Sequence, residues 1–335
     1  MKKIFVAGAS GFTGREIAAH LAGHPEFSVV AGLHTTPLSE DLAKKVTTAP
    51  FNLQDASTLE APLKGVDTVV FCAAGSRAVS VNGAQALLTA ARNQGVRRFI
   101  YLGCTSYYGL TGGTVHEAAP PKHDDHTIEA REKAEVESLC RAAAGSSMSV
   151  VILRAAQVLS HGGISSWGKV LTQRLRARKW GRIGIAGEGT ANILDIRDLA
   201  AAVEAAILRD EAAGKTYNVN GPEQITWNAF FDKYNQAMEF PYTRDMKMEM
   251  IGFRVLGAGP LKAVSDTIPL FRSKAREALL GAPSFYELDL YRLKAVYPTE
   301  AITRDLGWTP SVPLHKSIAD AATWARNNKT AWMSL

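Results

Sequence analysis

Short apolar runs alternate with amphipathic segments along the first two-thirds of this chain. Six of these runs have the length of a strand and lie at 4–8, 27–33, 67–73, 98–103, 149–154 and 216–220. Several are continuously apolar, as in parallel strands that are covered by helices on both faces. The pattern therefore predicts an α/β fold with a doubly wound parallel sheet and right-handed crossovers.

Helical segments fill the intervals between the runs. In residues 14–24, Ile17 and Leu21 are four positions apart and share one face. The segments 82–95 and 129–145 each end on a glycine, the residue that most often terminates a helix. Strand and helix alternate as a Rossmann sheet requires.

The alternation weakens after about residue 158. All six tryptophans lie in the segments 159–191 and 223–335. We predict that residues 1–158, with about 192–222, form a dinucleotide-binding Rossmann domain, and that 159–191 with 223–335 form a smaller substrate-binding lobe. The apolar but glycine- and proline-broken stretch 252–271 is interpreted as a pocket lid or the core of this lobe, with membrane contact as the alternative.

Composition indicates an ordinary globular protein, with 46% hydrophobic and 21% charged residues. The three cysteines, Cys72, Cys104 and Cys140, contain no metal-like pair, so we predict a reducing compartment and no metal site. No apolar run reaches the length of a transmembrane helix, and the apolar run at the amino terminus is too short for a signal peptide. We therefore expect a cytoplasmic protein.

The net charge of +6 has a local source, because five basic residues crowd one short segment. They are Arg174, Arg176, Arg178, Lys179 and Arg182. The segment is either a solvated helix face, a site for an anionic substrate or a contact for an anionic membrane surface. Nucleic acid is the weakest candidate, because no known module or interleaved aromatic residues accompany the charge.

Three glycines follow the first predicted strand and open the first helix. Gly8, Gly11 and Gly14 allow a tight turn in which backbone amides approach a pyrophosphate at the amino end of a helix. A single glycine triplet also occurs in simple turns. Its place between a strand and a helix near the start of an alternating chain indicates dinucleotide binding.

The spacing of these glycines resembles the short-chain dehydrogenase/reductase superfamily. Other segments resemble its extended, epimerase/dehydratase-like branch, in the family's order: GVDTVVFCAAG, VNGAQALLTAARNQGVRRFIYLG, SVVILRAAQVL, ANILDIRDLAAAV and LGWTPSVPLHKSIADAATWA. One departure is Ala155, which stands where the family usually has proline. The resemblance implies the fold, a nicotinamide cofactor and a small-molecule substrate of unspecified identity, and such proteins often form homodimers.

The resemblance also implies which residues contact the cofactor. They are Gly8, Ser10, Gly11, Phe12, Thr13, Gly14, His34, Asn52, Leu53, Ala73, Ala74, Gly75, Lys133, Ala156 and Gln157. NAD enzymes normally carry an acid at the end of the second strand. Here His34 and two threonines follow that strand, with no carboxylate before Glu40, so NADP is expected ahead of NAD.

The family's catalytic pair is a tyrosine four residues before a lysine, with a serine or threonine nearby. Lys133 matches the lysine, but Glu129 stands in the tyrosine's place. Thr105 best matches the hydroxyl residue, with Cys104 and Ser106 as alternatives. The predicted catalytic set is therefore Glu129, Lys133, Thr105, Ser106 and Tyr107.

Several roles for Glu129 remain open. Lys133 lowers the pKa of a nearby carboxyl, so Glu129 suits a base better than an acid. Tyr107 or Tyr108 could supply a phenol from another direction, and His126 could shuttle protons. Alternatively, Glu129 and Lys133 form an ordinary helix ion pair worth about 0.3–0.5 kcal/mol.

The leading functional interpretation is an NAD(P)-dependent oxidoreductase that acts on a hydroxyl or carbonyl carbon of a small, anionic molecule. The alternatives are a cofactor-retaining isomerase, epimerase or dehydratase, and a non-catalytic NAD(P)-sensing or scaffold protein. Retention of Lys133 and of the hydroxyl cluster favours an enzyme, whereas loss of the tyrosine favours a sensor.

Overall fold

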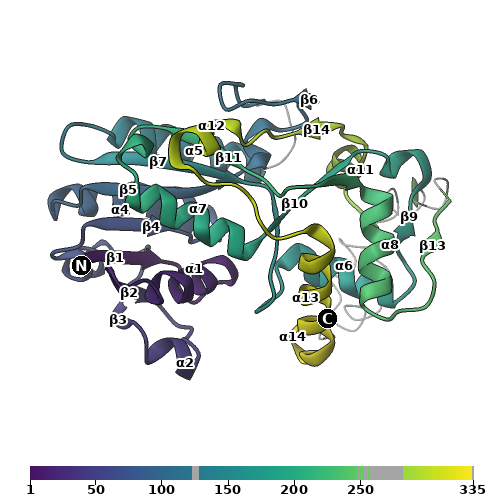
Figure 1. Ribbon diagram of the computed structural model, residues 1–335, viewed down its shortest axis with the longest axis horizontal. Helices are drawn as coiled ribbons and strands as arrows, with labels where there is room; N and C mark the ends of the chain where they lie inside the picture. The colour runs from purple at the N-terminus through teal and green to yellow at the C-terminus, as the bar shows by residue number, and fades with distance from the viewer. Residues whose placement is uncertain (123–127, 248, 250, 253–255, 257–281, 334–335) are drawn as a thin grey trace.

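The computed structural model describes residues 1–122, 128–247, 249, 251–252, 256 and 282–333. A parallel sheet between two layers of helices forms one part, and a smaller helical lobe lies beside it (Figure 1). Most of the predicted segment 252–271 lies outside the described residues. Within the described chain, no helix is both long and apolar enough to cross a bilayer.

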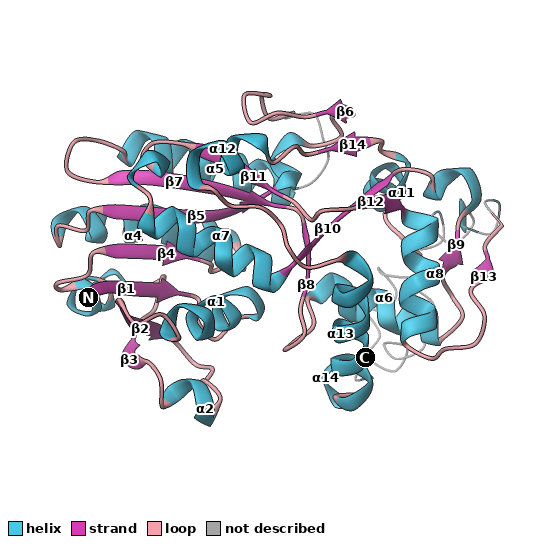
Figure 2. Ribbon diagram, in the orientation of Figure 1, coloured by secondary structure: helices cyan, strands magenta, loops and turns pink. Residues whose placement is uncertain are grey.

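The sheet confirms the predicted doubly wound fold. Its seven strands are β1 (Lys2–Ala7), β2 (Phe27–Leu33), β3 (Thr47–Pro50), β4 (Thr68–Phe71), β5 (Arg98–Cys104), β7 (Ser149–Ala155) and β11 (Thr216–Val219). They run in the order β11-β7-β5-β4-β1-β2-β3, and every neighbouring pair is parallel (Figure 2). All six expected strands are present, and β3 is an addition at the edge.

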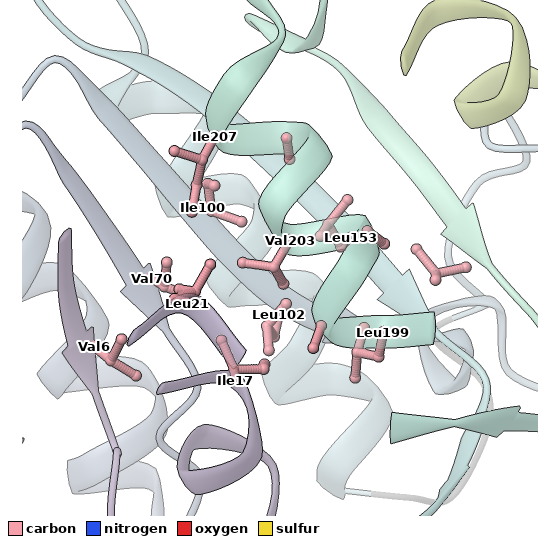
Figure 3. Packing of buried hydrophobic residues seen from close by; sticks show 14 of the residues in the cluster. Val6, Ile17, Leu21, Val70, Ile100, Leu102, Leu153, Leu199, Val203 and Ile207 are labelled. Carbon is pink, nitrogen blue, oxygen red and sulfur yellow. The ribbon is translucent and has the colours of Figure 1, made fainter. Parts of the chain in front are cut away.

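Helices cover both faces of this sheet. Helices α1 (Phe12–Ala22) and α7 (Ile196–Leu208) lie on one face, where Ile17 and Val203 pack against Val6 and Ile100 of the strands (Figure 3). On the other face lie α4 (Gly83–Asn93) and α5 (Ile128–Ala143). Short helical segments in the connections are α2 (Glu40–Ala43), η1 (Ala56–Thr58), α3 (Glu60–Leu63), the π-turn η2 (Ala78–Asn82), η3 (Thr105–Tyr108) and η5 (Asp210–Ala212).

A buried arginine fixes the carboxyl end of α7. The guanidinium of Arg98, at the start of β5, donates to the carbonyl oxygens of Ala206, Ile207 and Arg209 at 2.8, 3.1 and 2.9 Å. The last carbonyls of a helix have no partner within the helix, and a cation there interacts favourably with the negative end of the helix dipole. Arg98 therefore anchors α7 to the sheet.

The lobe contains its own small sheet and an aromatic core. The sheet has the order β12 (Gln224–Thr226), β10 (Thr190–Asp195), β8 (Gln157–Leu159). Around it lie α6 (Ser166–Arg176), η4 (Gly184–Gly187), α8 (Trp227–Ala237), α11 (Phe285–Arg292), α13 (Leu314–Asn327), α14 (Thr330–Met333) and the strand pair β9 (Gly181–Arg182) with β13 (Arg244–Asp245). Trp180, Trp227, Phe231 and Tyr291 pack edge to face or tilted at its centre.

The carboxyl-terminal segment returns to the Rossmann domain before it enters the lobe. Ile302 and Leu306 of α12 (Glu300–Leu306), with Trp308, belong to the core of the large sheet. The buried Asp198 carboxylate accepts from the backbone amides of Ser311 and Val312 at 3.0 and 3.1 Å. The boundary predicted at residue 223 therefore places α12 with the lobe, whereas its apolar face packs on the Rossmann domain.

Candidate functional site

The glycine turn lies where the chain order in the sheet reverses. From β1 the chain continues to β2 on one side, whereas β4 is the neighbour on the other side. Ligands of open α/β sheets bind at such a point, beyond the carboxyl ends of the strands. The turn after β1 and the turn after β4 (Ala73, Ala74 and Gly75) meet there, as expected of the predicted cofactor site.

Two glycines of the turn are required by close backbone contacts. Gly8 has a φ of +89°, and a Cβ atom there would lie 2.8 Å from the amide nitrogen of Ala73. A Cβ atom on Gly14 would lie 2.2 Å from the carbonyl oxygen of Gly8. Larger residues at these positions would push the two strand ends and α1 apart.

Gly11 leaves the amino end of α1 open to an anion. It is the N-cap residue, with a φ of −76°, and within the described part of the chain no side-chain hydrogen bond caps the helix. A Cβ atom on Gly11 would contact only the carbonyl oxygen of Gly8, at 3.2 Å. Unpaired amides and the helix dipole together fit a pyrophosphate. Ser10, Phe12 and Thr13 lie half-buried beside this opening.

The remaining cofactor-contact predictions fall at the ends of neighbouring strands. His34 is exposed and directly follows β2. The Asn52 side chain accepts from the amide of Gln54 at 3.0 Å, and Leu53 packs against Gly83 at the start of α4. Ala156 and Gln157 lie where β7 passes into β8. Their contacts with a nucleotide stay predictions.

The predicted catalytic residues come from α5 and from the turn after β5. Lys133 is half-buried, and its Nζ lies 5.7 Å from the ring centroid of Tyr101 on β5. Thr105 and Ser106 begin η3 directly after the same strand, and the Ser106 hydroxyl contacts the Cys104 thiol. Glu129 lies in the first turn of α5, but its side chain and His126 lie outside the described residues.

One hydrogen bond and one ion pair join α5 to the segment that follows β4. Ser80 donates to Glu132 at 2.9 Å, and Arg77 makes a two-point ion pair with Glu135 at 2.6 and 2.7 Å. The segment after β4 is part of the predicted cofactor site. These contacts therefore link the position of α5, and of Lys133, to the cofactor turn.

A buried charge network that the sequence analysis missed lies beneath η3. Arg154 of β7 and Glu137 of α5 are 1% and 0% exposed and are joined by hydrogen bonds of 2.9 and 2.7 Å. Arg154 also donates to the Tyr108 hydroxyl at 2.7 Å and to the carbonyl of Glu117 at 2.9 Å. In the sequence, the one feature that could have indicated this network is Arg154, an arginine at the end of the otherwise apolar run 149–154.

This network determines how the two tyrosines of η3 lie. The Tyr108 hydroxyl donates to Asn218 at 2.6 Å, and burial raises its pKa to about 12, although Arg154 opposes the rise. The Tyr108 hydroxyl is therefore held by Arg154 and Asn218, and its role as a proton-transferring phenol stays a prediction. Tyr107 is buried with its ring centroid 3.5 Å from the Arg154 guanidinium carbon, and its catalytic role stays a prediction.

Two of the five basic residues in the segment 174–182 form ion pairs inside the lobe. Arg174 is 7% exposed and pairs with Glu287 at 2.7 Å, and Arg182 pairs with Asp245 at 2.7 Å. These two guanidinium groups stabilise contacts between α6, α11, β9 and β13. The interpretation of the segment as a solvated helix face is therefore wrong for Arg174, whereas an anionic substrate at Arg176, Arg178 and Lys179 stays a prediction.

Fold and turn together define a dinucleotide-binding α/β protein of the extended short-chain dehydrogenase/reductase type. The model of the NAD dependent epimerase/dehydratase family matches residues 4–220, and the chain belongs to that family. The match supports an enzyme that uses a nicotinamide cofactor. No protein of curated function matches the sequence.

Solved structures with the same fold cover the chain almost from end to end. A short-chain dehydrogenase/reductase superfamily protein from Agrobacterium tumefaciens with bound NAD is 20% identical, with a TM-score of 0.71 and 98% of each chain covered. UDP-glucuronic acid 4-epimerase from Bacillus cereus, in complex with NAD, is 17% identical, with a TM-score of 0.72 and 98% of each chain covered. UDP-glucose 4-epimerase from Thermotoga maritima is also 17% identical, with a TM-score of 0.73 and 98% and 99% coverage.

Proposed function

We propose that this protein is an NAD(P)-dependent enzyme that oxidises or reduces a hydroxyl or carbonyl carbon of a small molecule, with Glu129 in place of the family's tyrosine. The proposal rests on three parts of the protein that come together on the side of the sheet where the parallel strands have their carboxyl ends. These parts are the open amino end of α1, Lys133 of α5 and the hydroxyl residues Thr105 and Ser106 after β5.

Each part of the proposed site has a separate role in the reaction. When bound, the nicotinamide supplies or accepts a hydride. The amides at the start of α1 hold the pyrophosphate, and Lys133 supplies a positive charge that favours the carboxylate form of Glu129. Glu129 then takes a proton from the substrate hydroxyl, while Thr105 donates a hydrogen bond to the same oxygen.

A second candidate is a cofactor-retaining epimerase or dehydratase. The description of the family favours it, as do the epimerases among the structural neighbours. The substrate would then be a nucleotide sugar, whose diphosphate agrees with the predicted anionic substrate. Both candidates need the same hydride step. Incubation with UDP-glucose and UDP-glucuronic acid tests them together, because epimerisation leaves net nicotinamide oxidation at zero, whereas oxidoreduction does not.

NADP(H) is expected to bind at least as tightly as NAD(H). A carboxylate at the end of β2 would repel a 2′-phosphate, and here the exposed residues are His34, Thr35 and Thr36. The NAD-bound structures among the relatives argue for the opposite preference. Calorimetric titration with both nucleotides decides between them. A clear NAD(H) preference that persists in His34→Ala would refute the argument from the missing acid.

Glu129→Gln is expected to lower turnover about a hundredfold, the usual effect of removing a positioned acid or base. The change keeps the size of the side chain and removes its charge, so nucleotide affinity should change little. Glu211→Gln, at an exposed position of the short helix η5, is the matched control and should keep turnover. Initial rates with whichever nucleotide sugar is accepted measure the effect. Full turnover in Glu129→Gln would exclude it as the base.

A further inference from the structure

A loop of the lobe lies against the first turn of α1. This loop, residues 160–165, joins β8 to α6 and passes beside α1 (Figure 2). The Arg15 guanidinium donates to the carbonyl oxygen of Gly162 at 2.6 Å. The same nitrogen lies 3.4 Å from the Glu16 carboxylate. The lobe and the Rossmann domain are therefore joined directly beside the predicted pyrophosphate site.

Two consecutive glycines permit this close approach. A Cβ atom on Gly162 would lie 2.3 Å from the Glu16 carboxylate oxygen. A Cβ atom on Gly163 would lie 2.6 Å from the Arg15 guanidinium and 3.2 Å from the ring of Phe12. Neither glycine has a positive φ. Glycine is therefore needed at these two positions because α1 is so close, and not because of the backbone conformation.

Two serines fix the ends of the loop. Ser160 is buried, and its hydroxyl accepts from the amide of Gly162 at 3.0 Å. The Ser165 hydroxyl accepts from the amide of Gly168 at 3.1 Å and caps α6. A loop that is held at both ends presents the Gly162 carbonyl to Arg15 in one orientation.

The place of Arg15 in its helix is unfavourable without an anion nearby. The amino end of a helix already has a partial positive charge, so a cation in the first turn is repelled by it. The first turn of α1 contains no acidic residue, and the N-cap Gly11 lies only one turn before Arg15. A pyrophosphate bound at the open amides would reverse the sign of this interaction, because it attracts both the helix end and the guanidinium.

We propose that Arg15 is a positioning residue, which fastens the loop 160–165 to the first turn of α1 and so retains the bound nucleotide. This inference rests on the proposed function, because it needs a pyrophosphate at the start of α1. The bond to Gly162 keeps the loop against Phe12, at the side of the nucleotide site. Differences in affinity between closely related complexes arise mostly in the dissociation rate, so the loss of Arg15 should be seen there.

Arg15→Met tests this role, because it removes the charge and the hydrogen bonds and keeps an unbranched apolar stem. We expect the dissociation rate constants of NADH and NADPH to rise about tenfold, as for the loss of one hydrogen bond to a charged group. Stopped-flow fluorescence after displacement with excess oxidised nucleotide measures them. Arg304→Met is the matched control, since Arg304 of α12 also pairs with the acid that follows it, Asp305, at 2.8 Å. It should leave both rate constants unchanged.

Gly163→Ala disturbs the same contact from the side of the loop and leaves the charge of Arg15 in place. The added methyl group meets the guanidinium and the Phe12 ring, so nucleotide release should again be faster. The double variant Arg15→Met with Gly163→Ala should release nucleotide no faster than Arg15→Met alone, because both changes break one contact. Effects that multiply in the double variant would show that Arg15 does not act through the loop, and would overturn the proposal.

Hydrogen exchange of the nucleotide-free protein gives a result that does not depend on binding. The amides of residues 160–165 should exchange faster in Arg15→Met than in the unchanged protein. An unchanged exchange rate would show that Arg15 does not hold the loop. If the unchanged protein binds neither nucleotide, the proposed function fails and the retention role fails with it. If it binds nucleotide and Arg15→Met releases it at the same rate, the retention role alone fails.

Discussion

Replacing Arg154 with methionine is expected to lower the free energy of unfolding by about 3–5 kcal/mol, because it leaves a buried carboxylate without its main partner. Glu137 is fully buried and would keep only Arg141, which donates to it at 2.6 Å. The change also removes a donor from the Tyr108 hydroxyl and a cation from the face of Tyr107. Urea denaturation followed by circular dichroism measures the loss.

Two comparisons separate burial from simple charge removal. Arg77→Met deletes an equally well-formed Arg–Glu pair on the surface, where both side chains are about half-exposed, and should leave the unfolding midpoint nearly unchanged. The double variant Arg154→Met with Glu137→Leu should recover much of the lost stability, since no unpaired charge is left inside. An effect of Arg154→Met as small as that of Arg77→Met would show that the pair contributes nothing beyond a surface contact.

Gly11→Asp is expected to abolish binding of both NAD(H) and NADP(H) while the protein stays folded. Gly11 is the N-cap of α1 with an ordinary φ, and aspartate is among the preferred N-cap residues. Its carboxylate would accept from the open amides of the helix and occupy the place of the pyrophosphate with a negative charge. Calorimetry should detect no nucleotide binding, whereas the free energy of unfolding should change by less than about 1 kcal/mol.

Gly11→Asn is the matched control, because asparagine caps the helix equally well and carries no charge. It should weaken nucleotide binding less than Gly11→Asp does. Equal binding by Gly11→Asp and the unchanged protein would mean that the pyrophosphate does not lie at the start of α1. Gly14 is not suitable for this test, since a Cβ atom there meets the Gly8 carbonyl and would disturb the turn itself.

The sheet and the glycine turn could be predicted because their signals are local. Apolar runs mark six of the seven strands, and the turn lies between one such run and a helix. Strand β3, with the sequence TTAP, was missed because it is four residues long, largely exposed and ends in proline, as edge strands can. The packing of α12 on the Rossmann core was missed because its short apolar pattern fits either domain.

The candidate site was less predictable because its parts meet only in three dimensions. Arg154 and Glu137 lie on a strand and a helix whose sequences give no sign that the two side chains pair. Tyr297 lies in a region without a recognisable motif, and only the path of the chain after β14 (Ala295–Val296) brings its ring against that of Tyr108. Motif comparison located Lys133 and the substituted Glu129, but it could not show which phenol lies near the hydroxyl cluster.

The place of β11 at the edge of the large sheet has a consequence for biosynthesis. Its partner β7 is followed by β8, α6 and β10 of the lobe, so a growing chain makes these elements before β11 (Figure 1). Until then β7 presents an unpaired apolar edge, the kind of surface on which nascent chains aggregate. Long-range pairing of this kind also slows folding. The time for which that edge is exposed therefore depends on how soon β11 is made and pairs with β7.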